Sequence, residues 1–258
     1  MAKSVAVINR KGGVGKTTCA VNIAVCLAAA GQNVLLLDMD PQGNATTHMG
    51  IRKEKGMGTV YHLLTGQKNV SQVLRTIYSP ALHFIMADSH LVGAEIELVD
   101  YKEREKKLSR ALEARAADFD FILIDCPPSL GLLTLNALVA ADGVIIPLQC
   151  EFFSMEGFMQ TRDTIERINR NFDKSITMDA VLFNMVDGSP EKNAFIQEFR
   201  ERLLEDSPVA TWTIPYDNQI NIAPSHLKPG VCFNPWGHAA KQFQEIALNL
   251  IWANRGSV

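Results

Sequence analysis

The sequence predicts an α/β protein with a mainly parallel, twisted sheet and helices on both of its faces. Two features of the chain carry this prediction. Short runs of continuous rather than alternating apolarity recur along it, which is typical of strands buried on both faces. These runs alternate with longer stretches of helical periodicity, the pattern of parallel strands joined by crossover helices. Because no repeat, low-complexity tract or linker interrupts the alternation, we expect residues 1–258 to form a single domain.

The expected strands are the short apolar runs, and two of them lead into carboxylates. They cover residues 4–8, 33–37, 82–86, 119–124, 143–148, 178–183 and 209–214. The second run leads to Asp38 and Asp40, and the fourth leads to Asp125. Ligands of open α/β sheets bind at the carboxyl ends of the strands, so these carboxylates mark the expected functional edge.

The expected helices are the segments with apolar residues at helical spacing. They cover residues 19–30, 91–117, 130–141, 154–171, 194–204 and 239–253, with short amphipathic segments at 60–64 and 70–77. Gly31 ends the first helix. Residues 41–58 are rich in Gly, Thr, Asn and Lys, and we expect a mobile loop there. The charged run at 102–107 is interpreted as a solvated helix face.

The most informative stretch joins the first strand to the first helix, where residues 9–18 read N-R-K-G-G-V-G-K-T-T. Its glycines permit a tight turn that directs backbone N–H groups inward, and the helix start adds partial positive charge. Strand, glycine turn and helix start in this order form a phosphate cradle, the P-loop, in which Lys16 reaches the β- and γ-phosphates and Thr17 ligates Mg²⁺. The expected nucleotide contacts are Lys11, Gly12, Gly13, Val14, Gly15, Lys16, Thr17 and Thr18.

The loop departs from the usual P-loop pattern at its neck. The pattern G-x-x-x-x-G-K-[ST] would place its first glycine at position 10, where this chain has Arg10. A second lysine, Lys11, follows. Its side chain either points to solvent or reaches a nucleotide held by another subunit.

The loop resembles the deviant Walker A motif, K-G-G-V-G-K-T-T, of the ParA/MinD family of P-loop ATPases. Residues 38–44 (D-M-D-P-Q-G-N), 125–128 (D-C-P-P) and 223–226 (A-P-S-H) extend the resemblance over most of the chain. The first two look most like the ParA/Soj branch, which positions plasmids, chromosomes and other large cargo. The resemblance implies a P-loop NTPase fold, ATP and Mg²⁺ as cofactors, and slow ATP hydrolysis stimulated by a ParB-like or other adaptor.

The resemblance also implies roles for single residues. Asp125 has the Walker B placement and would hold Mg²⁺ through a water, or it only caps the next turn. Asp40 matches the aspartate that orients the attacking water, whereas Asp38 either belongs to the metal site or only anchors the loop. Lys11 matches the signature lysine that contacts the partner's phosphates in a nucleotide-sandwich homodimer. Lys11, Lys16 and Asp40 are therefore the expected catalytic set.

The sequence indicates the site of the nucleotide base less clearly than the phosphate site. Relatives use a strand-end residue and a later Ile-Pro segment, and Asn184 and Pro215 stand at similar places. The Asn184 amide can pair with an adenine edge. Ordinary turn roles stay open for both residues.

Composition indicates an ordinary globular protein with reduced thiols. Apolar residues make up 47% of the chain and charged residues 21%, and no apolar run approaches the roughly 18 residues of a membrane span. The N-terminus does not resemble a signal peptide, so we expect a cytoplasmic protein. The five cysteines are scattered and lack a C-x-x-C pair. Cysteines could also hold an iron–sulfur cluster, as in the related nitrogenase iron protein, but buried cysteine usually acts as a small hydrophobe.

Non-specific DNA binding, common among ParA/Soj relatives, has weaker support. Residues 151–258, where it is expected, carry 10 basic and 14 acidic side chains, against 15 and 14 in residues 1–150. Binding needs a local basic patch. Residues 214–225 read I-P-Y-D-N-Q-I-N-I-A-P-S and lack both arginines of the similar family segment. The remaining candidates are Arg200, Arg202, Lys228 and Lys241, and for each of them the sequence favours a solvated surface charge over a DNA contact.

The sequence therefore predicts a ParA-like ATPase whose ATP-dependent dimer, dissolved by hydrolysis, positions DNA or another large cargo, with nucleoid association if DNA is bound. A MinD-like ATPase acting at a membrane surface is a second hypothesis. Residues 243–252 are amphipathic but contain no Lys or Arg, so we expect core packing there instead. A non-enzymatic nucleotide-sensing scaffold for a non-DNA cargo is a further alternative, and a redox iron–sulfur protein is the last.

Overall fold

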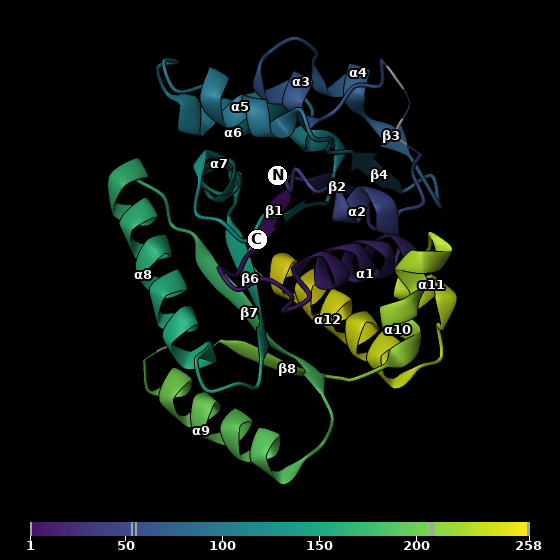
Figure 1. Cartoon of the computed structure of the whole chain (residues 1–258), viewed down its shortest axis with the longest axis vertical. Helices are drawn as coiled ribbons and strands as arrows, with labels where there is room; N and C mark the ends of the chain where they lie inside the picture. Colours follow the sequence, from purple (N-terminus) through teal and green to yellow (C-terminus); the bar gives the residue numbers. More distant parts are fainter. Residues whose placement is uncertain (1, 53, 55, 207–208, 257–258) are drawn as a thin grey trace.

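The computed structural model describes residues 2–52, 54, 56–206 and 209–256, and within them eight strands form one sheet (Figure 1). The strand order is β3-β4-β2-β5-β1-β6-β7-β8. The strands are β1 Lys3–Val7, β2 Val34–Asp38, β3 Arg75–Thr76, β4 Leu82–Ile85, β5 Phe121–Asp125, β6 Gly143–Gln149, β7 Thr177–Val186 and β8 Ala210–Pro215. Only β3 pairs antiparallel, with β4 at one edge, among the described strands. The predicted mainly parallel sheet is confirmed.

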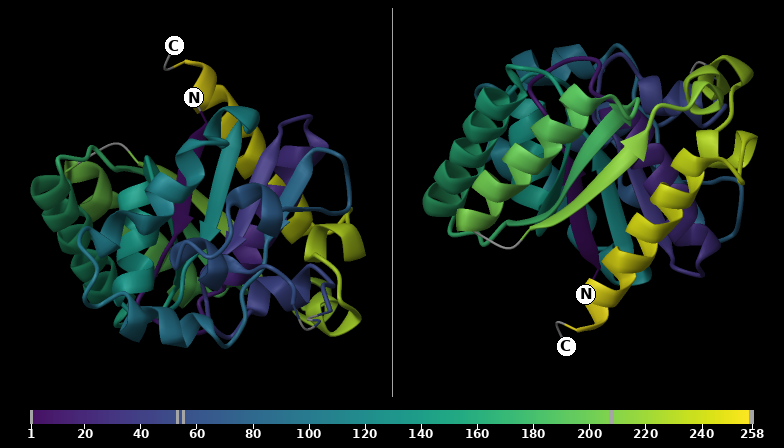
Figure 2. Two further views of the ribbon diagram at one scale, coloured as in Figure 1. Left: turned by 90° about the horizontal axis from the view of Figure 1, so that it is seen from above. Right: turned by 90° about the horizontal axis from the view of Figure 1, so that it is seen from below.

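Helices cover both faces of the sheet, as predicted (Figures 1 and 2). The α-helices are α1 Lys16–Ala29, α2 Asn44–His48, α3 Val60–Leu64, α4 Val70–Val73, α5 Leu91–Glu97, α6 Lys107–Glu113, α7 Leu132–Ala140, α8 Ser154–Phe172, α9 Pro190–Asp206, α10 Asn218–Ile222, α11 Gly230–Phe233 and α12 His238–Arg255. Short 3₁₀ turns are η1 Arg104–Lys106, η2 Ala116–Asp118 and η3 Ala223–His226. Helices α3 to α9 share one core with the sheet, and α1, α2 and α10 to α12 share the other.

Each central strand supplies both cores. In β5, Ile122 and Ile124 pack on the side of α3 to α9, whereas Leu123 packs on the side of α1 and α12. In β2, Leu37 packs on the side of α3 to α9, and Leu36 packs on the side of α1 and α12. This two-sided burial explains why the strands read as continuous apolar runs.

The C-terminal helix α12 turns its apolar side toward the sheet. Phe243, Ile246 and Leu250 are buried, which confirms the core packing expected of residues 243–252. Within the described ranges, no helix combines the length and apolarity that a membrane crossing requires.

The segment 91–117 is not the single helix that its periodicity predicted. It divides into α5, η1, α6 and η2, and Glu103 at the break has a left-handed φ of 53°. The Asn136 side chain on α7 holds this break: it donates to the Arg104 carbonyl at 2.9 Å and accepts the Leu108 N–H at 3.1 Å. A long-range partner decides the boundary, and apolar periodicity does not reveal such partners.

Other segments are more structured than their composition indicated. Helix α2 lies within the predicted loop 41–58, because the buried Asp38 carboxylate accepts the Thr46 N–H at 2.8 Å. In 70–77 the helix stops with α4, and residues 75–76 pair with β4 as β3. The sequence did not predict α10, η3 and α11, which follow β8. There the Val231 N–H donates to the buried Asn22 side chain of α1 at 2.8 Å.

Candidate active site

The P-loop connects β1 to α1 at the carboxyl edge of the sheet. Val7, the last residue of β1, pairs in register with Asp125 of β5, and Asp125 pairs with Asp38 of β2. The tight turn uses positive φ angles of 77° at Gly13 and 91° at Gly15, which an L side chain rarely adopts. Strand register and glycine geometry thus place the loop and both carboxylates at one edge.

Lys16 begins α1 and folds back over the loop. Its Nζ atom donates to the Lys11 carbonyl at 3.1 Å, and the side chain is mostly buried. Burial lowers the Lys16 pKa, while the nearby carboxylates of Asp125 and Asp40 act in the opposite direction. The ammonium group therefore lies inside the cradle.

Asp125 places its carboxylate in the protein interior. Neither side-chain oxygen has a hydrogen bond within the described residues, although the group is fully buried. Burial raises the Asp125 pKa well above its usual value, and the neighbouring Asp38 adds to the shift. The Thr17 hydroxyl has a smaller opposite effect without reaching hydrogen-bond geometry. Two orphaned acceptors beside a threonine hydroxyl fit a Mg²⁺ ion held directly or through water.

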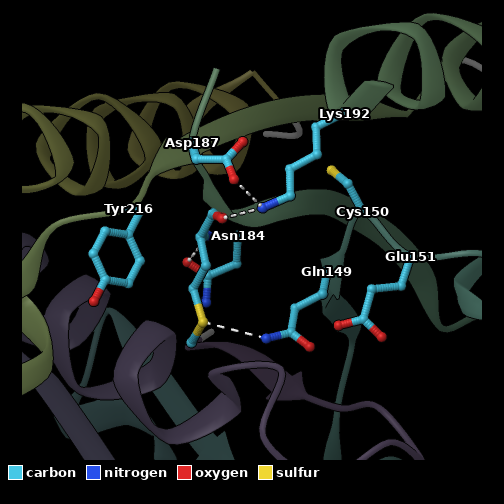
Figure 3. A pocket seen from close by; sticks show the side chains of 8 residues that line it. Gln149, Cys150, Glu151, Asn184, Asp187, Lys192 and Tyr216 are labelled. Atoms are coloured by element: carbon cyan, nitrogen blue, oxygen red, sulfur yellow. Dashed lines mark hydrogen bonds and ion pairs between the residues drawn. The ribbon is translucent and has the colours of Figure 1, made fainter. Parts of the chain in front are cut away.

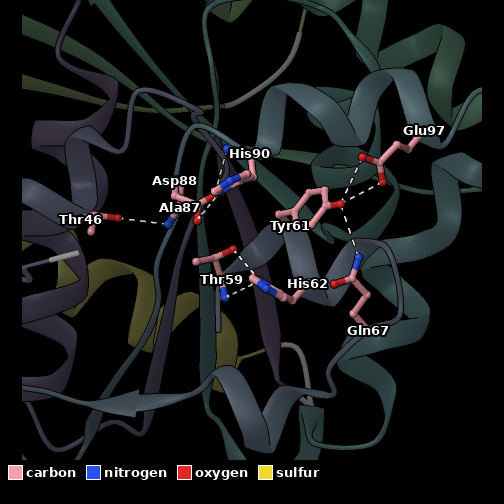
Figure 4. Close-up of polar contacts among 9 residues, drawn as sticks. All are labelled: Thr46, Thr59, Tyr61, His62, Gln67, Ala87, Asp88, His90 and Glu97. Carbon is pink, nitrogen blue, oxygen red and sulfur yellow. Dashed lines mark hydrogen bonds and ion pairs between the residues drawn. The ribbon is translucent and has the colours of Figure 1, made fainter. Parts of the chain in front are cut away.

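Asp38 differs from Asp125 because its oxygens are occupied. They accept the Thr46 hydroxyl at 2.7 Å, the Thr46 N–H at 2.8 Å and the Asp40 N–H at 3.1 Å. The Thr46 hydroxyl in turn accepts the Ala87 N–H at 3.1 Å, so the chain of bonds reaches the loop after β4 (Figure 4). Burial raises the Asp38 pKa to about 6. These contacts favour the loop-anchoring role over the metal-ligand role.

Asp40 lies on the wall of a cavity of about 410 Å³ in front of the P-loop. Its Oδ1 atom accepts the Gln42 N–H at 2.9 Å. The wall is formed by Gly12, Gly13, Gly15, Lys16, Thr17, Thr18, Asp40, Gln42, Asn44, His48, Pro128 and Met185. Sequence reasoning did not single out His48, whose pKa burial lowers to about 4. The cavity combines the charge, hydroxyl and backbone groups that a triphosphate requires.

Asn184 and Tyr216 line a second cavity of about 460 Å³ next to the P-loop (Figure 3). The Asn184 amide donates to the Val14 carbonyl at 2.9 Å, and its oxygen accepts the Met185 N–H at 3.0 Å. Asn184 therefore supports the phosphate loop in this structure. Pro215, the other predicted base contact, ends β8 and is followed by Tyr216.

Lys11 does not line the cavity of its own P-loop. Its side chain, 40% exposed, forms an ion pair with Glu151, which is 53% exposed. The Lys11 N–H donates to the Asn9 side chain at 2.9 Å, and Asn9 donates to the Pro147 carbonyl at 2.7 Å. Thus Pro147 of β6 holds the loop neck and the loop after β6 supplies the Lys11 partner, which no local sequence pattern indicated.

Comparison with known proteins assigns the chain to a family. A family model described as an AAA domain matches residues 2–178. The sporulation initiation inhibitor protein Soj of Bacillus subtilis is 41% identical over 96% of this chain and 97% of its own length. The chromosome partitioning protein ParA of Myxococcus xanthus is 39% identical over 91% of this chain and 82% of its own length. The chain belongs to the ParA/Soj family of partition ATPases.

Solved structures share the fold of this ParA/Soj chain. Cobyrinic acid a,c-diamide synthase from Mycobacterium smegmatis, solved with a bound ATP analogue and magnesium, has a TM-score of 0.86 and 31% identity. The superposition covers 100% of this chain and 98% of that one. The cell division ATPase MinD of Pyrococcus furiosus, at 22% identity, shares the fold with a TM-score of 0.80 over 98% of this chain and 100% of its own.

The four DNA candidates of this ParA/Soj chain do not form one patch. Arg200 donates to the Thr211 hydroxyl at 2.9 Å and lies over the Phe183 ring, and Arg202 pairs with Glu198 at 2.7 Å. Both belong to α9, on the α8 side of the sheet. Lys228 precedes α11 and Lys241 lies on α12, on the other side. The structure thus separates the candidates into two pairs.

The cysteines of this ParA/Soj chain are free thiols. Cys19, Cys26 and Cys126 are buried, Cys150 is half-buried and Cys232 is exposed. Burial raises the Cys126 pKa well above its usual value. Within the described ranges no group of three or more His, Cys, Asp or Glu side chains is arranged to hold a metal ion.

Proposed function

We propose that this ParA/Soj protein is a dimerising ATPase switch: two copies clamp face to face over bound ATP, and hydrolysis releases them. The observation that carries the proposal is the placement of its two loop lysines. Lys16 lies inside the cradle, whereas Lys11 stands outside it on an exposed glutamate. A lysine in that position can serve a nucleotide held by a facing subunit.

Different residues of one subunit carry out different parts of ATP hydrolysis. Lys16 and the N–H groups of the P-loop bind the phosphates, and Asp40 orients the attacking water. Thr17 and Asp125 hold Mg²⁺, which when bound neutralises charge on the phosphate oxygens. The orphaned oxygens of Asp125 support this assignment, as does the magnesium bound with an ATP analogue in the M. smegmatis relative.

Dimerisation requires Lys11 to exchange partners. Its ion pair with Glu151 is exposed, and such pairs contribute only about 0.2–1 kcal/mol. A triphosphate on the facing subunit offers more charge in a site from which the dimer excludes water, where attraction is stronger. The weak pair with Glu151 therefore gives way readily to a triphosphate-loaded partner, and the gain from that triphosphate makes dimer formation depend on ATP.

The switch positions a large cargo in the cytoplasm. Soj and ParA relatives are named for chromosome partitioning and sporulation control, which supports DNA as cargo or track. A ParB-like or other adaptor protein stimulates the slow hydrolysis. Non-specific DNA binding by the ATP dimer is the expected link to the nucleoid, with Lys228 and Lys241 on one side of the sheet and Arg200 and Arg202 on the other as its candidate contacts.

The decisive experiment compares wild type with Lys11→Ala and Lys16→Ala by sedimentation velocity, with ADP or a slowly hydrolysed ATP analogue and Mg²⁺. Lys16→Ala is expected to lose nucleotide binding. Lys11→Ala is expected to bind the analogue normally but to stay monomeric and inactive. Normal analogue-dependent dimers of Lys11→Ala would refute the proposal. Retention of the wild-type dimer on arbitrary duplex DNA, weakened by salt, would support the nucleoid link.

A further inference from the structure

Two phenylalanines stand almost fully exposed on the loop between β6 and α8. Phe152 is 86% exposed and Phe153 is 71% exposed, and their rings meet edge to face at 5.1 Å. Phenylalanine side chains gain free energy when they leave water. A contiguous apolar surface of this kind marks an interaction site more often than a solvated loop.

A groove of about 480 Å³ adjoins the two rings, where the start of α8 lies beside α9 (Figure 1). Phe152 and Phe153 form part of its wall, together with Met155 of α8 and Phe195 of α9. Phe195 packs on Phe199, whose ring meets the buried Phe158 of α8 at 5.0 Å, so the groove floor rests on the hydrophobic core. We call the projecting rings and this groove the aromatic patch.

The aromatic patch adjoins the Lys11 ion pair. Phe152 directly follows Glu151, the partner of Lys11, and both come from the loop after β6 at the carboxyl edge. Any molecule that brings a triphosphate to Lys11 must approach this edge. The patch is therefore continuous with the face on which the proposed dimer forms.

The patch has the two features that a two-fold contact requires. An isologous interface uses the same surface on both subunits, so that surface must contain both a projection and a recess. Phe152 projects, and Phe153, Met155 and Phe195 are the apolar side chains that line the groove beside it. The rim carries both signs of charge: Glu156 and the ion pair of Arg202 with Glu198. An exclusively acidic or basic rim would instead oppose a second copy.

We infer that the aromatic patch binds the same patch of a second copy of this chain when triphosphate is bound. The inference rests on the proposed ATP-dependent dimer and adds the contact that gives it affinity. Aromatic anchors in central pockets commonly carry most of the binding energy of an interface. ATP and Lys11 then determine whether the two patches come into contact, and the phenylalanines determine the affinity of the dimer.

The test uses Phe152→Ala/Phe153→Ala, with Trp252→Ala as the matched control. Trp252 is also an exposed aromatic residue, at 75%, but it lies near the end of α12, which is beside the chain's N-terminus and the amino edge of the sheet (Figure 2). In sedimentation with the ATP analogue and Mg²⁺, the double variant should dimerise at least about tenfold more weakly than wild type. Trp252→Ala should match wild type, and all three proteins should bind the analogue equally.

A second variant reports on the patch without removing it. Phe152→Trp should dimerise normally, and its tryptophan emission should shift to shorter wavelength on adding the analogue, with a midpoint that follows protein concentration. Suppose that wild type dimerises, that the double variant dimerises with the same affinity as wild type, and that the Phe152→Trp emission does not shift. These results would overturn the inference and leave the proposed function intact. If the double variant dimerises as tightly as wild type but no longer binds another macromolecule, the groove is a site for that macromolecule. This result would also overturn the inference. If wild type does not dimerise, the proposed function fails first.

Discussion

Asn184 donates its side-chain N–H to the Val14 carbonyl at 2.9 Å, across 170 positions of sequence. The bond ties the end of β7 to the phosphate loop. The approach is so close that a Cβ atom on Gly15 would lie 2.1 Å from the Asn184 amide nitrogen. Gly15 therefore serves two needs at once: a left-handed φ and room for this side chain.

Replacing Gly15 with alanine should cost more than its backbone conformation alone explains. Gly188→Ala is the matched control, because Gly188 has a φ of 77° but nothing within 4 Å of an added Cβ. Gly188→Ala should cost only the strain of about 1–2 kcal/mol, whereas Gly15→Ala should also displace Asn184 and lose ATP binding. Chemical denaturation and nucleotide titration measure the two effects. Equal effects of the two substitutions would contradict the steric role of Asn184.

Glu151→Gln should release Lys11 for its role across the dimer. Since an exposed ion pair contributes about 0.2–1 kcal/mol, analogue-dependent dimerisation should become up to about fivefold tighter. Because the monomer loses the same small stabilisation, its melting temperature should fall by no more than about 4 °C. Asp118→Asn, which removes the exposed pair with Arg115, is the control and should leave dimerisation unaffected. A weaker dimer in Glu151→Gln would mean that Glu151 itself contacts the partner subunit.

Asp125→Asn should stabilise the nucleotide-free protein and abolish its response to Mg²⁺ and ATP. The carboxylate is buried and accepts no hydrogen bond from the part of the chain that the structure describes, so its charge opposes folding until a cation binds. The neutral amide should raise the nucleotide-free melting temperature by about 3–8 °C. Wild type should gain stability from Mg²⁺ with ATP, whereas Asp125→Asn should not. The exposed Asp163→Asn is the control, and a lower nucleotide-free melting temperature in Asp125→Asn would exclude the orphaned-charge argument.

The sequence predicted local features of the site better than contacts between distant segments. Glycine spacing between a strand and a helix predicted the P-loop, and the strand-end carboxylates predicted the edge of the sheet at which the cavity lies, because strand period and turn geometry are local properties. The pairing of Lys11 with Glu151 and the support of the loop by Asn184 depend on β6 and β7 lying on the same side of β1 in the sheet. No periodicity in the chain encodes those neighbours.

In the fold, too, local features were predicted better than those that depend on distant segments. The continuous apolar runs predicted the parallel strands, since burial on both faces demands them. The break in 91–117 depends on Asn136, and α2 depends on Asp38. A single buried polar side chain, contributed by a distant element, ended or started a helix in both places.

His48 should make the fold sensitive to acid. Burial lowers its pKa in the folded protein to about 4, below the value of about 6.5 in an unfolded chain. Between these values the unfolded chain binds more protons, so stability should be full above pH 6.5, fall as the pH decreases, and level off near pH 4. His48→Gln should flatten this part of the profile of unfolding free energy against pH, measured by urea denaturation. The exposed His238→Gln should follow wild type, and an equal flattening in both variants would exclude His48 as the specific cause.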